Sequence, residues 1–389
     1  MRRGRFVVLV IDSCGAGAMP DAAVYGDAGA NTLANTAKRA GGLTLPTLQR
    51  WGLGNITGIA GCAPRASPEA SWGAMRELSP GKDTTTGHWE MMGVVLEKAF
   101  TTFPQGFPED LMTQWLRLSG APGFLGNKPA SGTEILDELG AQHLATGFPI
   151  VYTSADSVFQ IAAHESKVPL ATLYAWCEAA RTVGKVRGIA RVIARPFVGA
   201  PGAFKRTYDR RDFSQPPPAG TVLDLLAESG VRTVGVGKIP DIYDSRGIGE
   251  AVHTEGNADG LAKTRELLSS LESGLLFVNL VDTDMLYGHR RDVMGYARAL
   301  EEIDAALPAI AARLREGDLL VITADHGNDP TFPGSDHTRE RVPLLAYAPG
   351  RAGEALGERE SFADLGATAA EYFGVRAPRG RSFFGQLRG

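Results

Sequence analysis

Four short, continuous apolar runs along the chain are each followed at once by polar residues. They are "RFVVLVID" (5–12), "VRTVGVGK" (231–238), "LLFVNLVDTD" (275–284) and "DLLVITADHGND" (318–329). Continuous apolar runs of this length are typical of strands covered on both faces, as in a parallel sheet. The pattern therefore predicts a buried parallel sheet whose strands end in polar loops.

Helical patterns alternate with these strands. The segments 219–230, 260–274 and 296–317 each precede a predicted strand, and "FADLGATAAEYFG" (362–374) closes the chain. Strands that alternate with helices are typical of a sheet with helices packed on both faces. We therefore predict an α/β fold with a three-layer α/β/α core.

The pattern changes between residues 99 and 218. A helix is predicted at "SGTEILDELG" (131–140), where Ser131 and Glu134 have the spacing of a capping box, and short strands at 150–156 and 190–199. The proline-rich run "QPPPAG" (215–220) is typical of a linker. We predict a smaller α+β cap domain, residues 99–218, inserted into a discontinuous catalytic core of residues 1–98 and 219–389.

Composition narrows the class of protein. The 389 residues carry a formal net charge of -4, which argues against a non-specific nucleic-acid binder. No apolar run reaches membrane-spanning length, so we expect no membrane association. The cysteines Cys14, Cys62 and Cys177 are odd in number and widely spaced, which favours reduced thiols in the cytoplasm.

Three predicted strands end in acidic residues, Asp12, Asp284 and Asp325. A single aspartate after a strand ordinarily caps the next helix. However, ligands of open α/β sheets bind at the carboxyl ends of the strands. If these strands are neighbours, the three carboxylates converge on one edge.

Three histidines lie in acidic, glycine-rich loops: His289, His326 and His337. Aspartate combined with neutral imidazole suits Zn²⁺, Mn²⁺ or Fe²⁺ better than Ca²⁺. Six such groups are enough for two metal ions, an arrangement that serves phosphoryl transfer. We expect His143 and His253 to be surface residues.

The stretch "KDTTTGHWEMMG" (82–93) offers a nucleophile for such a site. Its threonines precede a helix-like run, and the free N–H groups at a helix N-terminus favour phosphate. The same threonines could serve only as helix caps. Spacing alone does not select among Thr84, Thr85 and Thr86.

Several of these motifs resemble a known family. The segments "ADHGND", "SDHT" and "KDTTTGHWE", with the aspartate after the first strand, resemble the alkaline phosphatase superfamily. The segments "GNKPASGTEILDELG", "VYTSADSVFQIAAHE", "RVIARPFVG" and "GHRRD" extend the likeness over nearly the whole chain to the phosphopentomutase family within it. "ADHG" alone would indicate only the superfamily.

This resemblance implies roles for the candidate residues. Thr84 would carry phosphate and bridge two metal ions. One metal is expected on Asp12, Asp325 and His326, and the other on Asp284, His289 and His337. Asp282 would lie outside the ligand shell. The resemblance favours two Mn²⁺ ions, and other divalent metals would also suit these ligands.

The resemblance also implies substrate-binding residues. The basic residues would hold the phosphate that does not react, and the Ser–Asp pair would bond ribose hydroxyls. They are Arg191, Arg195, Arg206, Lys238, Ser154 and Asp156. Surface charge and turn formation are the alternative explanations for these positions.

The activity implied is interconversion of ribose 1-phosphate, or 2-deoxyribose 1-phosphate, with the 5-phosphate. Glucose 1,6-bisphosphate or ribose 1,5-bisphosphate would activate the enzyme. Its binding partners would be small-molecule pentose phosphates, and the protein would be a monomer. A phosphatase or phosphodiesterase of the same superfamily is the first alternative. A metal-stabilised binding protein that forms no phosphoenzyme is the second.

Overall fold

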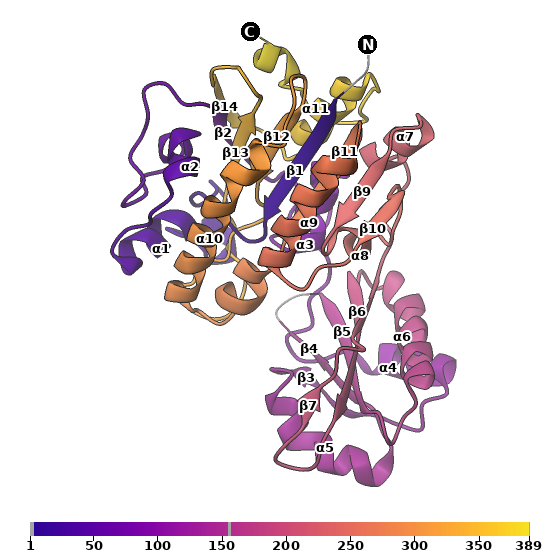
Figure 1. Ribbon diagram of the computed structural model, residues 1–389. Helices are drawn as coiled ribbons and strands as arrows, with labels where there is room; N and C mark the ends of the chain where they lie inside the picture. Colours follow the sequence, from indigo (N-terminus) through magenta and orange to yellow (C-terminus); the bar gives the residue numbers. More distant parts are fainter. Residues whose placement is uncertain (1–3, 155–156, 389) are drawn as a thin grey trace. The chain divides into compact units, whose positions relative to one another are not determined.

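The computed structural model describes residues 4–154 and 157–388. The chain forms two compact units, one of Met1–Ala99 with Pro217–Gly389 and the other of Phe100–Pro216 (Figure 1). The sequence placed these boundaries after residue 98 and before residue 219. We call them the larger and the smaller unit.

The larger unit is built on a sheet of eight strands in the order β10-β9-β11-β1-β12-β13-β2-β14. The strands are β1 (Arg5–Ile11), β2 (Ser71–Met75), β9 (Thr233–Val236), β10 (Glu250–Val252), β11 (Gly274–Leu280), β12 (Leu319–Thr323), β13 (Val342–Tyr347) and β14 (Ala355–Arg359). Strands β10, β9, β11, β1 and β12 are parallel to one another, and β13 is antiparallel to both β12 and β2. The four predicted strands are thus the adjacent strands β9, β11, β1 and β12.

Helices pack on both faces of this sheet, which confirms the predicted three-layer core. They are α1 (Thr32–Ala40), α2 (Pro46–Arg50), α3 (Thr84–Met91), α7 (Val222–Glu228), α8 (Ile239–Ile242), α9 (Asn257–Ser270), α10 (Val293–Ala311) and α11 (Ala363–Phe373). Helix α10 contacts α9, α1 and α2, whereas α11 contacts α7 and α3. In Figure 1, α9 and α10 lie in front of the sheet and α3 and α11 behind it. Every position of β1, β11 and β12 is buried, because both faces of these strands are covered.

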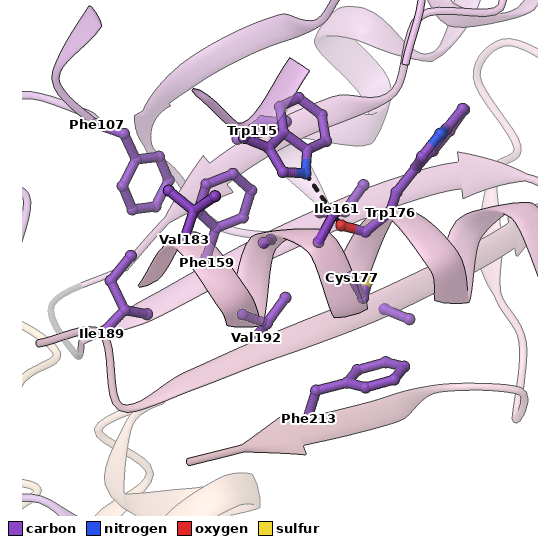
Figure 2. Packing of buried hydrophobic residues seen from close by; sticks show 14 of the residues in the cluster. Phe107, Trp115, Phe159, Ile161, Trp176, Cys177, Val183, Ile189, Val192 and Phe213 are labelled. Carbon is purple, nitrogen blue, oxygen red and sulfur yellow. Dashed lines mark hydrogen bonds between the residues drawn. The ribbon is translucent and has the colours of Figure 1, made fainter. Parts of the chain in front are cut away.

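The smaller unit has a mixed six-stranded sheet, ordered β3-β4-β5-β6-β7, with β8 also paired to β6. Its elements are β3 (Leu125–Pro129), β4 (Ile150–Thr153), β5 (Val158–His164), β6 (Arg191–Val198), β7 (Lys205–Arg206), β8 (Arg211–Ser214), α4 (Glu109–Ser119), α5 (Glu134–Thr146) and α6 (Leu170–Lys185). Figure 2 shows Phe159 and Ile161 of β5 packed with the indole of Trp115. Trp115 Nε1 donates a hydrogen bond to the Trp176 carbonyl at 3.0 Å, which ties α4 to α6.

Two local predictions in this unit are wrong. Helix α5 has Thr133 as its N-cap and no side-chain capping bond, because the Ser131 hydroxyl lies 3.1 Å from the Thr133 hydroxyl instead. His143 is buried rather than exposed. Its ring hydrogen-bonds the Phe148 carbonyl and the backbone N–H of His164, so it joins α5 to β5.

Among the helices that the structure describes, none is long and apolar enough to cross a membrane. All three cysteines are free and buried.

Candidate metal centre

The central strands deliver the candidate acids to one edge of the larger sheet. Asp12 directly follows β1, and its backbone N–H donates to the Leu280 carbonyl at the end of β11 at 3.1 Å. Asp325 follows β12, which pairs with β1 in parallel register. Asp284 lies in a π-helical turn, Thr283–Gly288, which begins shortly after the end of β11 at Leu280. Because the carboxyl ends of adjacent parallel strands lie at the same edge of a sheet, these carboxylates share that edge.

Asp12, Asp325 and His326 form what we call the first cluster. His326 Nε2 lies 3.5 Å from Asp12 Oδ1 and 3.3 Å from Asp325 Oδ2, and all three residues are at most 1% exposed. Both of these carboxylate oxygens are buried and have no hydrogen-bond partner among the described residues. Unpaired buried oxygens are costly, and a divalent cation would satisfy them.

The electrostatics of the first cluster also fit a cation. Burial and the charge of Asp325 raise the pKa of Asp12 to about 7. Burial would raise the pKa of Asp325 as well, but His326 and His88 lower it to about 2. Burial lowers the pKa of His326 to about 4, so its ring is neutral near pH 7 and its Nε2 lone pair can bind a metal.

Asp284, His289 and His337 form the second cluster. His289 Nε2 lies 3.2 Å from Asp284 Oδ2, and His337 Nε2 lies 3.4 Å from Asp284 Oδ1. The two Nε2 atoms are 3.2 Å apart. The candidate ligand atoms of His326, Asp284 and His337 also all lie within 4.8 Å of one another. Since one imidazole nitrogen has a single lone pair, His326 can serve only one cluster. If it serves the first, His289 is the candidate for the third position of the second.

The ring orientation of His289 supports this assignment. Its Nδ1 lies 2.7 Å from the Ser335 carbonyl, which only accepts, so Nδ1 carries the proton and Nε2 presents a lone pair. That lone pair points at His337 Nε2 beside an aspartate. Imidazole nitrogens and a carboxylate that converge in this way are a donor set for Mn²⁺, Zn²⁺ or Fe²⁺ when the imidazoles are neutral.

The structure distinguishes among the three candidate threonines. Thr84 is the first residue of α3, and its Oγ1 lies 3.2 Å from His326 Nε2. The Thr86 hydroxyl and backbone N–H instead bond the Asp83 carboxylate, which caps the helix. The close approach of α3 needs Gly87, because a Cβ there would lie 2.0 Å from the Asp325 carbonyl. Of these two threonines, Thr84 is thus the one placed at the first cluster.

Two residues at this site were not among the predicted ones. His88 Nδ1 lies 2.9 Å from the Thr84 carbonyl and 3.2 Å from Asp325 Oδ2. Asn279 Nδ2 donates to Asp12 Oδ2 at 2.9 Å. The spacing of Thr84 and His88, one helical turn apart, was a signal that could have indicated His88. Nothing in the sequence marked Asn279.

Asp282 lies away from both clusters. Its Oδ2 accepts the backbone N–H of Asn257 at 2.7 Å, and its own N–H donates to Asn257 Oδ1 at 2.9 Å. This carboxylate therefore holds the first turn of α9, the ordinary role of an aspartate at a helix N-terminus.

The predicted substrate-binding residues are divided between the units. Lys238 follows β9 in the larger unit, and its charge lowers the pKa of Asp12, which places it near the first cluster. Ser154 follows β4 in the smaller unit, and Asp156 lies outside the described residues. The three predicted arginines, Arg191, Arg195 and Arg206, belong to strands β6 and β7 of the smaller unit.

The three arginines share one face of the smaller sheet. Arg191 and Arg195 are four residues apart on β6, and Arg206 pairs with Phe197 of the same strand. Arg191 forms an ion pair of 3.1 Å with Asp212. Burial and the charges of Arg210 and Arg206 lower the pKa of Arg195 to about 10. Positive charge crowded in this way favours an anionic ligand.

Comparison with known proteins accounts for this combination of fold and ligands. The fold and the clustered acids and histidines define a metalloenzyme. Residues 4–377 match the sequence model of the Metalloenzyme superfamily. A phosphopentomutase of Anaeromyxobacter sp. (strain K) is 64% identical over 98% of this chain and 99% of its own length. One from Symbiobacterium thermophilum is 56% identical over 99% of this chain and 98% of its own. The chain therefore belongs to the phosphopentomutase family, as the sequence motifs predicted.

Proposed function

We propose that this enzyme interconverts the 1- and 5-phosphates of ribose or 2-deoxyribose through a phosphothreonine at Thr84. The observation that carries the proposal is the position of the Thr84 hydroxyl, at the N-terminus of α3 and 3.2 Å from His326 Nε2. Membership of the phosphopentomutase family supports the reaction type.

In the first half of the reaction, the free hydroxyl of a pentose phosphate attacks the phosphorus on Thr84. The hydroxyl proton is lost, the bond from phosphorus to Thr84 Oγ1 breaks, and a pentose bisphosphate results. In the second half, Thr84 Oγ1 attacks the other phosphate, and the released sugar oxygen regains a proton. Phosphoryl transfer of this kind depends on positioning and on compensation of charge.

Residues of the chain would supply both. The backbone N–H groups at the N-terminus of α3 favour a phosphate on Thr84. His88 bonds the Thr84 carbonyl and contacts Asp325, so it fixes the nucleophile relative to the first cluster. Two divalent metals, which we propose to be Mn²⁺, would neutralise the charge of the reacting oxygens when held by the two clusters.

The smaller unit would bind the phosphate that does not react. Arg191, Arg195 and Arg206 share one sheet face, and guanidinium groups match phosphate oxygens in pairs. Lys238, in the larger unit, would also hold phosphate, and Ser154 and Asp156 would bond ribose hydroxyls. We propose that the smaller unit acts as a substrate-binding cap domain.

Three further expectations belong to this proposal. A sugar bisphosphate would restore phosphate to Thr84 when it has been lost. The enzyme would act as a monomer. It would reside in the cytoplasm, where its three buried free cysteines stay reduced.

A turnover assay tests the proposal. The Mn²⁺-loaded protein would be incubated with ribose 5-phosphate, with and without a trace of glucose 1,6-bisphosphate, and ribose 1-phosphate and free phosphate would be measured separately. We expect isomer formation, stimulated by the bisphosphate, with little free phosphate. Free phosphate without isomer would instead establish a phosphatase that uses the same metal centre. If neither ribose 1-phosphate nor free phosphate formed, the substrate assignment would be refuted.

A further inference from the structure

We propose that Arg291 is a positioning residue that assembles the second cluster, acting through Asn328 on Asp284. The proposal rests on the metal centre proposed above. Arg291 and Asn328 themselves lie outside its proposed ligands. Arg291 follows the His289 segment, and its side chain is partly buried.

The guanidinium of Arg291 joins three of the segments that carry the proposed metal ligands. Nη1 donates to the carbonyl of Gly288, next to His289, at 3.1 Å. Nη1 also donates to Asn328 Oδ1 and, at 3.2 Å, to the Asp329 carbonyl, both in the loop after His326. Nε and Nη2 donate at 2.6 and 2.7 Å to the carbonyls of Gly334 and Asp336, just before His337.

The backbone at Arg291 supports a specific role. Its backbone φ is +55°, in the left-handed region that residues other than glycine, asparagine and aspartate seldom adopt. Such a conformation persists only where surrounding bonds hold it, and residues of this kind gather at functional sites. Here the guanidinium bonds supply that hold.

The chemistry of the groups determines how Arg291 acts on the metal ligand. Arginine only donates hydrogen bonds, so the oxygen of the Asn328 amide must face Arg291. The amide nitrogen then faces Asp284, and Nδ2 donates to Asp284 Oδ1 at 2.7 Å. Asn328 is fully buried and cannot turn to water for another partner. The Asp284 carboxylate is therefore held in a fixed orientation toward the two histidines of its cluster.

Lysine could not replace this arginine. An ammonium is a point donor on a flexible stem, whereas the planar guanidinium has donors directed along separate lines. Residues that orient metal ligands in this way typically change metal affinity by about 10- to 100-fold when mutated.

The test is Mn²⁺ binding measured by calorimetry on full-length protein freed of metal with a chelator. We expect Arg291→Lys to weaken one of two binding steps by about 10- to 100-fold and to leave the other unchanged. Arg290→Lys, at the exposed neighbouring position, should bind as the parent does. Asn328→Ala removes the donor to Asp284 but spares the carbonyl contacts, and should weaken the same step.

Two further readouts separate positioning from general stability. In a His289→Ala background, Arg291→Lys should cause little additional loss, because both changes act on one site. Mutase turnover of Arg291→Lys should recover as Mn²⁺ is raised.

Unchanged affinity at both steps would overturn the proposal, and so would equal loss at both steps with a lower unfolding temperature of the metal-free protein. If Arg291→Lys fails to fold, Asn328→Ala decides by the same criteria. Metal binding needs no turnover, so the result is independent of the proposed reaction.

Discussion

The first and second clusters present similar ligands to a metal but are held in different ways. The residues of the first cluster follow the adjacent parallel strands β1 and β12 and are at most 1% exposed. Those of the second come from a π-helical turn and a long loop, and the His289 side chain is 32% exposed. The sheet itself builds the first site, whereas side-chain bonds between loops build the second.

The largest expected effect concerns the nucleophile at the first cluster. Thr84→Ala removes the only atom of this residue that could carry phosphate, so turnover should fall by at least about 1,000-fold. Both metal ions should remain bound, because the six clustered acids and histidines are unchanged. Turnover and metal content, measured by elemental analysis, check the two statements.

Thr84→Ser is the matched control, since it keeps a hydroxyl at the start of α3. It should retain part of the turnover and an acid-stable phosphate on the protein. Mutase activity of Thr84→Ala near that of the parent would exclude this residue as the phosphate carrier.

A smaller loss is expected from Gly87→Ala, which tests whether close backbone packing builds the first cluster. The added methyl group would meet the Asp325 carbonyl at 2.0 Å, so α3 must shift away from β12. A displacement of about 1 Å at a reacting group can reduce turnover about 100-fold. We expect kcat to fall by about 10- to 100-fold while Mn²⁺ binding to the second cluster stays unchanged.

Gly58→Ala is the control for this change, because a Cβ at Gly58 meets nothing within 4 Å. It should leave both kcat and metal binding unaltered. Equal effects of the two substitutions on kcat would show that the contact between α3 and Asp325 does not position Thr84.

The same contrast explains what the sequence could predict. Apolar runs that end in aspartate predicted the central strands and the edge where Asp12 and Asp325 meet, because a parallel sheet turns chain order into position. The unpredicted strands of the larger sheet, β2, β10, β13 and β14, are not continuous apolar runs that end in an acid. Helix α5 also lacks its predicted cap, since the Ser131 hydroxyl bonds Thr133 instead.

Residues that act through other residues were beyond sequence reasoning. Asn279 and Asn328 each donate to one aspartate across a long separation in the chain, and no spacing marks such a pair. Selecting Thr84 over its neighbours required either the family resemblance or the hydrogen bonds of α3. The second cluster depends on contacts of this kind more than the first does.

The last prediction compares the clusters in metal-free protein. Burial and Asp325 raise the pKa of Asp12 from 3.8 to about 7, so the native state binds a proton there more tightly than the unfolded chain does. Stability should therefore fall as pH rises from about 4 to 7, because the unfolded state binds fewer protons over that range. At pH 8, Asp12→Asn should stabilise the chelator-treated protein by about 1–3 kcal/mol, since one pKa unit corresponds to about 1.4 kcal/mol.

Asp284 should behave in the opposite way. Although it is buried, the adjacent His289 and His337 lower its pKa well below the ordinary value, so its charge stabilises the native state above that value. Asp284→Asn should destabilise the same metal-free protein near neutral pH. Denaturant titrations from pH 4 to 8, with chelator and with Mn²⁺, measure both signs. If both substitutions destabilised the metal-free protein, the first cluster would not hold excess negative charge. If both stabilised it, the second cluster would not balance the charge of Asp284.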